Sequence, residues 1–575
     1  MGVSSAIGAQ GLKRVWDRTL PLVSSNQVGW LILGFGATLR AVEYFSNSAL
    51  YVDEGAIALN IINRTFGGFF QTLDFNQAAP PGFLVLEKLA VLTLGDGEYA
   101  LRLIPFLFSI AALLLFRAAA RRVLAAWLVP IAILFFAVSE QVIYYSAQVK
   151  QYSSDVALTL LVLLVGLEVE SKGLNAARTA LLAMIGVVAV WLSHPSVFVL
   201  AGVGSSLALI ALKRRRAPLF WQLAGCYALW VLSFAAFYLI SLSRLSANER
   251  LETSWMNKGT FMPLPPTSWS ELEWFPSTFF KIFSNPLDSP FPLIAGLVFI
   301  AGCFALMFKR RAHLMLLVSP VLLTLLASGV HKYPFGRRLL LFSVPLILIV
   351  IAEGFDFFLK RGWLAGLLIF EIAMFQLIFG GDLIPSWKRL IFFVALSGLV
   401  IFAGRTATSL DKRKLYAGAL CSVILVVLLL QPVGGAVNRV RYPSSRQDIR
   451  PVMSYVRDNR QPGDLTYVYH HQLESFLYYA PRYGFSSTEY VIGKDKREQW
   501  KDGENEAYKQ ELEQLHGKPR VWVVFSHVRS VNGISEESYL VQHLDRIAKR
   551  LDQFKTGNAS VYLFDLSGNS MRPTE

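Results

Sequence analysis

Long apolar runs separated by short polar turns occupy the first three quarters of the chain. A helix needs about 20 mostly apolar residues to cross the roughly 30 Å hydrocarbon core of a bilayer. Runs that reach or approach this length lie near residues 28–45, 99–117, 123–139, 155–169, 179–193, 196–212, 219–240, 291–308, 314–330, 339–354, 363–380, 390–403 and 416–431. The pattern therefore predicts a polytopic α-helical membrane protein with about 13 transmembrane helices.

The pattern changes in the last quarter, where charged residues become frequent. Alternating apolar positions in "DLTYVYH", "RVWVVFSH" and "SVYLFDL" predict strands, and the amphipathic stretch 537–552 predicts a helix between two of them. We expect residues 434–575 to form a small α/β domain outside the membrane.

The loop 46–98, after the first apolar run, also carries a pattern. Residues 54–66 and 83–94 have apolar side chains at helical spacing on either side of "NQAAPPG", which predicts two short helices lying in the membrane interface. A second long loop spans 241–290.

Composition supports this picture: 54% of the residues are hydrophobic and 17% are charged. The net charge of +15 comes mostly from short basic clusters between apolar runs, a pattern typical of cytoplasmic loops. We therefore expect membrane lipids as the anionic partner and no nucleic acid. The three cysteines lie inside apolar runs, so neither disulfides nor a thiolate metal site is predicted.

The basic clusters also predict an orientation. We take residues 1–27 as an uncleaved cytoplasmic N-terminus and 28–433 as the transmembrane domain. Alternation of the spans then places five basic clusters in the cytoplasm, as the positive-inside rule requires: 121–122, 213–216, 309–311, 360–361 and 412–414. Both long loops and the C-terminal domain lie on the outer side, where the chemistry should be sought.

The loop 46–98 opens with an acidic pair, Asp53 and Glu54, in "YVDEGAIALN". Adjacent helical residues point about 100° apart, so the two carboxylates are expected to have different tasks. One could act as a general base toward a hydroxyl, with partial desolvation raising its pKa toward a useful range. The alternative is that both acids stabilise the first turn of an interfacial helix. Arg102 is expected to pair with one of them.

A basic turn, "HKYPFGRRLLLF", lies on the same predicted side. Lys332, Arg337 and Arg338 crowd the start of a helix whose dipole is already positive, which is unfavourable unless an anion is bound. Arginine forks suit phosphate oxygens and would stabilise a departing phosphate. Lipid headgroups are the alternative ligands.

Three further polar residues are weaker candidates. Lys150, in "YYSAQVKQYSSD", has the same two interpretations as the basic turn. His194, in "WLSHPSV", could hydrogen-bond a phosphate or be structural. Asp155 opens the fourth span, either as a helix cap or as an orienting group for the site.

Five segments, taken in order, resemble the GT-C glycosyltransferases, in the branch of protein O-mannosyltransferases and lipid A aminoarabinose transferases. The resemblance covers most of the first 430 residues, and bacterial members share the thirteen spans and the outer C-terminal domain. The segments are "YVDEGAIALN", "NQAAPPGFLVLEKLAV", "GEYALRLIPFLF", "YYSAQVKQYSSDVALTLL" and "YPFGRRLLLF".

The resemblance implies an inverting transfer of a sugar from a polyprenyl-phosphate donor to a hydroxyl of a lipid, glycan or protein. The reaction would take place on the outer, periplasmic face of a bacterial inner membrane. Asp53 would deprotonate the acceptor, and Glu54 would be held by Arg102. The residues implied to bind the carrier phosphate are Arg337, Arg338 and Lys332, with Lys150 and His194 as additions.

The sequence departs from the family pattern at Ala79, because many relatives have a histidine before the paired prolines. A metal-binding role is therefore not carried over to this position. No metal ligands are predicted, and a divalent cation stays open as a cofactor, since two adjacent acids without a third ligand are weak evidence for one.

Three other classes of protein remain as alternatives. A lipid-linked glycan flippase or transporter would be expected to place polar groups at mid-membrane and to show repeats, whereas nearly all the charge here lies at the ends of spans. A glycan polymerase or ligase would also need basic residues for a carrier phosphate, but the acidic pair favours the transferase. The third alternative is a non-catalytic scaffold that docks partners through its tail.

Overall fold

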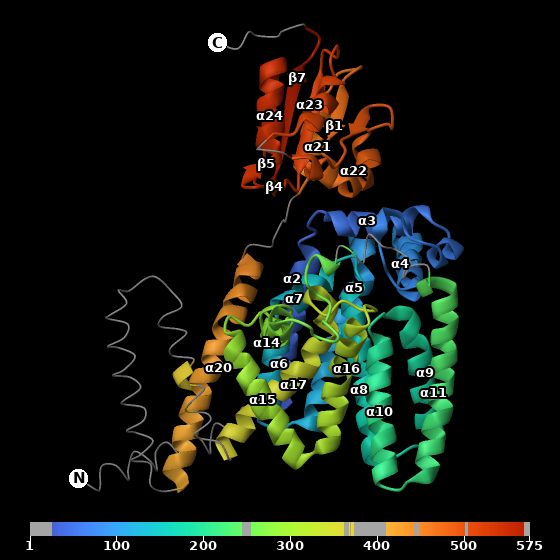
Figure 1. Ribbon diagram of the computed structural model, residues 1–575, viewed down its shortest axis with the longest axis vertical. Helices are drawn as coiled ribbons and strands as arrows, with labels where there is room; N and C mark the ends of the chain where they lie inside the picture. The colour runs from blue at the N-terminus through green and yellow to red at the C-terminus, as the bar shows by residue number, and fades with distance from the viewer. Residues whose placement is uncertain are drawn as a thin grey trace, which may run out of the picture.

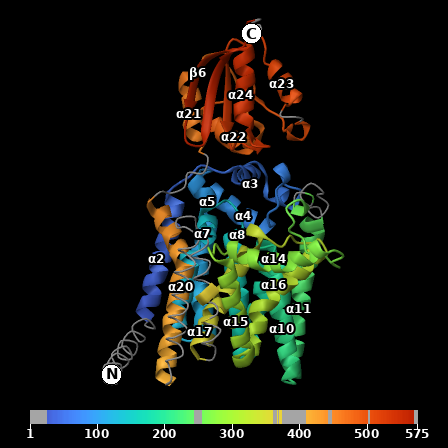
Figure 2. The ribbon, with the colours of Figure 1, turned by 60° about the vertical axis from the view of Figure 1, so that its left-hand side comes forward.

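The computed structural model describes residues 26–243, 253, 255–360, 367, 370–372, 410–441, 448–500 and 504–568. It has two parts (Figures 1 and 2): a bundle of long helices, and a smaller α/β domain that lies beyond one end of the bundle. We call this end of the bundle the domain end and the other the far end.

The helices of the bundle agree with the apolar pattern. Within the described residues, eight helices are long and apolar enough to span a membrane, and a bent pair at 128–138 and 140–147 would make nine. The described helices of the bundle, including those too short to count as spans, are α2 (Asn26–Phe45), α5 (Glu98–Val123), α6 (Leu128–Val138), α7 (Glu140–Tyr144), α8 (Tyr152–Lys172), α9 (Ala176–Leu192), α10 (Ser196–Lys213), α11 (Ala217–Phe237), α14 (Trp269–Ser284), α15 (Pro292–Lys309), α16 (Arg311–Gly329), α17 (Val344–Lys360) and α20 (Leu410–Arg441).

The chain is thus a polytopic α-helical membrane protein, although the count of 13 spans is not confirmed. The predicted spans 363–380 and 390–403 lie almost wholly outside the described residues. The predicted span 179–193 corresponds to α9, whose 17 residues make it one of the shorter apolar helices. The helix α20 continues to Arg441, beyond the predicted boundary at 433.

Two central helices hold the bundle together. In the apolar part of α8, 89% of the residues are buried, and in that of the segment 337–360, 94% are buried. α15 packs so closely on α17 that a Cβ at Gly302 would lie 1.9 Å from the Val350 carbonyl oxygen. Small residues allow this close approach, as is common between membrane helices.

The loop 46–98 forms two short helices where the sequence predicts them, α3 (Val52–Asn63) and α4 (Pro81–Leu94), with the 3₁₀ turns η1 (Phe66–Phe70) and η2 (Asp74–Asn76) between them. Proline at the first turn of α4 is favourable because its missing N–H would have no partner there. Figure 1 shows both helices lying across the domain end of the bundle.

The C-terminal domain is a five-stranded sheet of order β2-β1-β3-β7-β6 with helices around it. β1 is parallel to β2 and β3, while β7 is antiparallel to β3 and β6. The elements are α21 (Arg450–Asn459), β1 (Leu465–Val468), α22 (Leu473–Tyr479), β2 (Tyr490–Ile492), α23 (Glu506–Glu513), β3 (Val521–Ser526), the hairpin β4 (Ser530–Val531) and β5 (Ile534–Ser535), α24 (Glu536–Ile547), β6 (Lys549–Lys555) and β7 (Ala559–Asp565).

The three predicted strands correspond to β1, β3 and β7, but the prediction of a helix over 537–552 is wrong in its last five residues. α24 ends at Ile547, and Lys549–Lys555 is the edge strand β6. Exposed and half-buried side chains alternate along β6, because it pairs with β7 and covers the sheet with one face only.

The domain is docked on the loop 46–98. α22 lies so close to α3 that a Cβ at Gly55 would be 2.9 Å from the backbone carbonyl of Glu474. The Tyr479 hydroxyl accepts a hydrogen bond from the Leu50 amide at 2.9 Å and donates one to Glu98 at 2.9 Å. These contacts hold the domain above the start of α3.

Candidate active site

The acidic pair lies at the start of α3, where its two members are in different environments. Tyr51 is the N-cap, and its amide donates to Glu54 Oε2 at 3.1 Å, so Glu54 caps the helix. Glu54 is only 2% exposed. Asp53, one residue earlier, faces a cavity and is 31% exposed.

Glu54 is held by Arg102 in a buried ion pair. The Nη2 atom of Arg102 lies 3.1 Å from both carboxylate oxygens, and its Nε atom lies 3.2 Å from Oε1. The same oxygen accepts the Val149 amide at 3.0 Å. Glu54 therefore ties together α3, α5 and the turn that carries Lys150.

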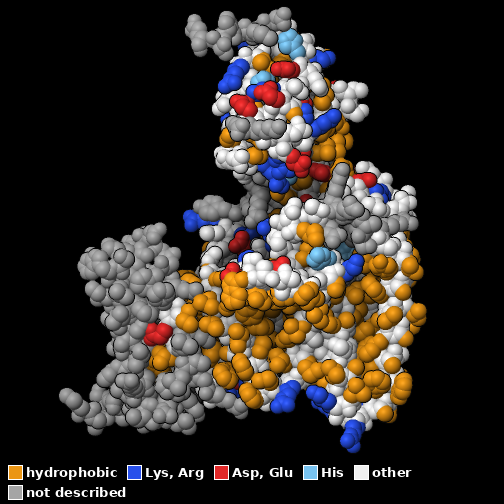
Figure 3. Space-filling view, in the orientation of Figure 1, with side chains coloured by type: hydrophobic (Ala, Val, Ile, Leu, Met, Phe, Trp, Pro, Cys, Tyr) orange, Lys and Arg blue, Asp and Glu red, His pale blue; other side chains and the backbone are white. Residues whose placement is uncertain are grey.

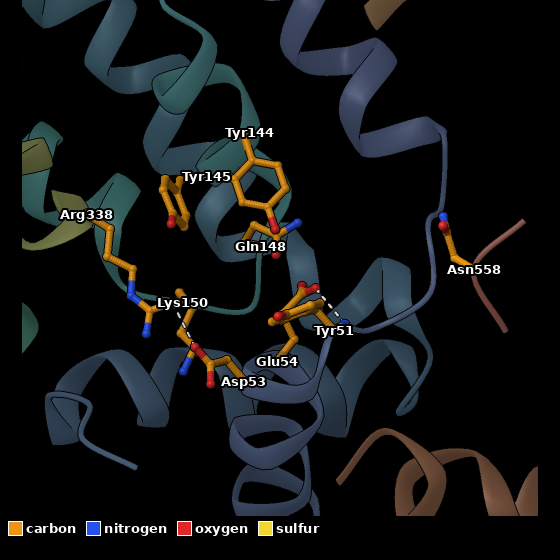
Figure 4. A pocket seen from close by; sticks show the side chains of 9 residues that line it. All are labelled: Tyr51, Asp53, Glu54, Tyr144, Tyr145, Gln148, Lys150, Arg338 and Asn558. Atoms are coloured by element: carbon orange, nitrogen blue, oxygen red, sulfur yellow. Dashed lines mark hydrogen bonds and ion pairs between the residues drawn. The ribbon is translucent and has the colours of Figure 1, made fainter. Parts of the chain in front are cut away.

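The cavity has a volume of about 430 Å³ and opens at the domain end of the bundle. Figure 4 shows Asp53, Lys150 and Arg338 turned toward one another within it. Its lining residues are Tyr51, Asp53, Glu54, Tyr144, Tyr145, Gln148, Lys150, Arg338 and Asn558. The cavity thus joins α3, the end of α7 and the turn that follows it, the start of the 3₁₀ helix η5 (Arg337–Ser343) and the C-terminal domain.

Asp53 is paired with Arg338 across this cavity, at 2.7 Å between Oδ2 and Nη1. Burial alone would raise the pKa of Asp53, but the charges of Lys150, Arg338 and Lys258 outweigh it and lower the pKa to about 2. The expectation that desolvation raises this pKa above its usual range is therefore wrong. Asp53 is ionised and surrounded by cations.

Lys150 is 6% exposed, and its Nζ atom donates to Gln77 Oε1 at 2.7 Å. Burial lowers its pKa to about 8, even though the nearby charge of Asp53 favours the protonated form. At neutral pH Lys150 and Arg338 therefore supply two positive charges to one small cavity.

The other two residues of the basic turn lie outside the cavity lining. Arg337 and Lys332 are exposed. Arg337 begins the 3₁₀ helix η5 (Arg337–Ser343) with φ of +53°, a left-handed conformation that is uncommon for residues other than glycine. The structure brings Arg338 to Asp53 and leaves Arg337 at the surface.

Two further predicted residues also lie away from the lining. His194 packs on Phe237, with ring centroids 5.9 Å apart, and burial lowers its pKa to about 4. Asp155 is 4% exposed within α8, and its Oδ1 atom has no hydrogen-bond partner among the described residues. The N-cap of α8 is Gln151, so Asp155 is not the cap.

Sequence reasoning missed several lining residues. Gln148 lies two residues before Lys150 in "YYSAQVKQYSSD", so the sequence could have indicated it as a site residue. Asn558, in the turn between β6 and β7, gives no sequence signal because only docking of the domain brings it to the cavity. The same docking places His527 against Tyr51, with ring centroids 4.7 Å apart.

The described residues contain no group of three His, Cys, Asp or Glu side chains that could hold a metal ion. The described cavity instead combines one solvent-accessible carboxylate with two cations. Such an arrangement can bind an anion and accept a proton beside it.

No protein-family model and no curated protein matches this chain. Among solved structures, ArnT from Cupriavidus metallidurans in the apo state is similar at 14% identity and a TM-score of 0.48, over 96% of this chain and 100% of that one. Oligosaccharyltransferase AglB from Archaeoglobus fulgidus, in complex with an inhibitory peptide and a dolichol-phosphate, is similar at 11% identity and a TM-score of 0.42, over 95% of this chain and 75% of that one. Arabinosyltransferase EmbB from Mycobacterium smegmatis is similar at 12% identity and a TM-score of 0.44, over 74% of this chain and 42% of that one. These proteins belong to the GT-C superfamily that the sequence resembles.

Proposed function

We propose that this protein is a membrane glycosyltransferase that moves a sugar from a polyprenyl-phosphate donor to an acceptor hydroxyl. The acceptor is a hydroxyl of a lipid, glycan or protein. The reaction takes place at the domain end of the bundle, on the periplasmic face of a bacterial inner membrane. The observation that carries the proposal is the meeting of Asp53 with Arg338 and Lys150 in one cavity at that end.

The cations give this cavity the chemistry of a phosphate site. Arg338 presents a fork of N–H donors, and Lys150 adds a buried ammonium within reach of the same space. When the donor phosphate binds, it replaces part of the attraction between Arg338 and Asp53. The pKa of Asp53 then rises from about 2, since the cations that lower it are neutralised. Donor binding thus turns a weak base into a better one.

The proposed transfer step gives each of these groups a role. Asp53 takes the proton of the acceptor hydroxyl while the oxygen of that hydroxyl forms a bond to the anomeric carbon. The bond from that carbon to the phosphate oxygen breaks, and its electron pair stays on the phosphate. Arg338 and Lys150 stabilise this growing charge most strongly in the transition state. Attack opposite the leaving phosphate inverts the anomeric configuration.

Glu54 and Arg102 have a positioning role in this scheme. Their buried ion pair fixes the first turn of α3, which carries Asp53, to the turn that carries Lys150. A small displacement of either reacting group would lower the rate steeply.

A second cavity is suited to the lipid part of the donor. It has a volume of about 150 Å³ and is lined almost entirely by apolar side chains of α14, α15, α16 and α17. Phe335, which lies in the basic turn two residues before Arg337, is part of its lining. A prenyl chain in this cavity would bring its phosphate toward Arg338 from the membrane side.

The experiment uses purified protein in lipid nanodiscs with a panel of polyprenyl-phosphate sugars and membrane extract as the acceptor source. Release of free polyprenyl phosphate is followed for wild type, Asp53→Asn and Asp74→Asn. Asp74 is the matched control, because it lies in the same loop, 62% exposed, and pairs with Arg64 outside the cavity. Release that is lost only in Asp53→Asn supports the proposal. A folded wild-type protein that releases nothing from any donor would favour a flippase or polymerase.

A further inference from the structure

A second polar cavity lies at the far end of the bundle, away from Asp53. Its volume is about 750 Å³, and it lies between the ends of α5, α8, α10 and α15 and the start of α16. Figure 3 shows lysine and arginine side chains gathered at this end of the helices. None of the reaction steps above involves this cavity.

The lining of this cavity is strongly basic. Six of its residues are lysine or arginine and two are glutamate. Both glutamates are already paired, Glu168 with Arg122 at 2.6 Å and Glu170 with Arg214 at 2.6 Å. The cavity therefore keeps an excess of positive charge after its internal ion pairs are formed.

Two arginines carry this excess. Arg310 donates to the Arg122 carbonyl at 3.2 Å, and Arg311 donates to the Met307 carbonyl at 3.1 Å. Neither has a carboxylate partner among the described residues. Both stand at the start of α16, a helix of 19 residues whose positive dipole end adds to the local potential.

A buried polar group points to the same kind of ligand. His313 lines the cavity and is 8% exposed, and its Nδ1 atom has no hydrogen-bond partner among the described residues. Buried polar atoms are normally satisfied, so a bound group is expected to complete this site.

We infer that this cavity binds a phosphate-bearing anion, and that the anion is the headgroup of an anionic phospholipid. Apolar side chains beside the cavity favour a lipid over a soluble phosphate. Leu212 at the end of α10 is 56% exposed, and Phe308 at the end of α15 is 63% exposed. They would lie against acyl chains while the headgroup enters the cavity, as in basic pockets between membrane helices.

The alternative to a site is a diffuse attraction between basic loops and anionic lipid. Lys213 and Arg215 provide a matched control for this alternative. They are exposed at the same end of the bundle, and neither lines the cavity. Replacing them removes two positive charges, the same number as replacing Arg310 and Arg311.

The test is a lipid titration by native mass spectrometry on the purified full-length protein, with phosphatidylglycerol and phosphatidylcholine as probes. Wild type should retain phosphatidylglycerol in preference to phosphatidylcholine. Arg310→Gln combined with Arg311→Gln should weaken retention of phosphatidylglycerol about 30-fold, as expected when each arginine loses one direct hydrogen bond to the headgroup phosphate. Lys213→Gln combined with Arg215→Gln should change it about twofold or less.

Three results would overturn the inference. Equal losses in the two double variants would indicate diffuse attraction. Equal retention of the two lipids by wild type would show that the cavity does not select an anionic headgroup. Displacement of phosphatidylglycerol by glycerol phosphate or inorganic phosphate at similar concentration would assign the cavity to a soluble phosphate compound. Arg310→Lys with Arg311→Lys guards against misfolding, because it keeps the charge and should retain most of the binding.

Discussion

The buried ion pair between Glu54 and Arg102 gives the sharpest prediction about stability. Arg102→Met would leave the Glu54 carboxylate in a site where only 2% of its side chain is exposed. Its bonds to the Val149 and Tyr51 amides would remain, but its only charged partner among the described residues would be lost. An uncompensated buried charge of this kind costs about 3–5 kcal/mol.

A double variant separates this charge effect from simple loss of contacts. Arg102→Met combined with Glu54→Gln removes both charges, and its one side-chain carbonyl can still accept one of the two amide bonds. The remaining cost is the loss of the other amide bond and of the hydrogen bonds from Arg102 to the Ser48 and Ala49 carbonyls, at about 1 kcal/mol each. The double variant should therefore be destabilised by about 3 kcal/mol, less than the single variant, which loses the same Arg102 bonds and also leaves the charge of Glu54 uncompensated.

The assay is reversible denaturant unfolding in detergent micelles, followed by tryptophan fluorescence. Arg64→Met is the control, because the carboxylate with which it pairs, Asp74, is 62% exposed, so this pair should contribute about 1 kcal/mol or less. If Arg102→Met is no more destabilising than Arg64→Met, or if the double variant is the least stable of all, the role given to this ion pair is refuted.

Other predictions concern the site directly. Arg338→Ala should lower kcat/KM by about 10²–10³-fold, as expected for a group that stabilises transition-state charge, whereas exposed Arg337→Ala should lower it less than about tenfold; equal losses would contradict the assignment. Because Lys150 binds phosphate only when protonated, kcat/KM should fall as pH rises through about 8, and Lys150→Arg should remove this decline. Asp53 must be ionised to act, so activity is lost as pH falls through its pKa; this acid limb should appear at higher pH in kcat than in kcat/KM, since bound donor raises the pKa. Tyr479→Phe removes both hydrogen bonds of this docking hydroxyl, to the Leu50 amide and to Glu98, and should speed amide hydrogen exchange at the start of α3; unchanged exchange would contradict the docking role.

Local pattern was enough to locate most elements of the fold. The strands β1, β3 and β7 and the short helices α3 and α4 lie where periodicity predicts them. The helix predicted over 537–552 includes the first four residues of β6, because charged residues there suit the polar face of an amphipathic helix as well as the exposed face of a strand. Its pairing with β7 decides its conformation, and pairing cannot be read from a single segment.

The site shows the same division between local and long-range information. The pairing of Arg102 with one of the two acids could be anticipated from its place at the start of a predicted span, and the resemblance implied that this acid is Glu54. The difference between Arg337 and Arg338 could not, because it depends on the backbone turn into η5. The low pKa of Asp53 was also out of reach, since it depends on three cations from distant segments.

The most direct test of the central claim is a single-turnover measurement of the proton-accepting role of Asp53. Donor is bound to excess protein, acceptor is added, and free polyprenyl phosphate is followed in wild type, Asp53→Asn and Asp74→Asn. We predict that Asp53→Asn slows release by about 10²–10⁴-fold while binding donor as tightly as wild type or more tightly, because it removes a negative charge beside the phosphate. Release at the wild-type rate in Asp53→Asn, with Asp74→Asn also unchanged, would contradict the account.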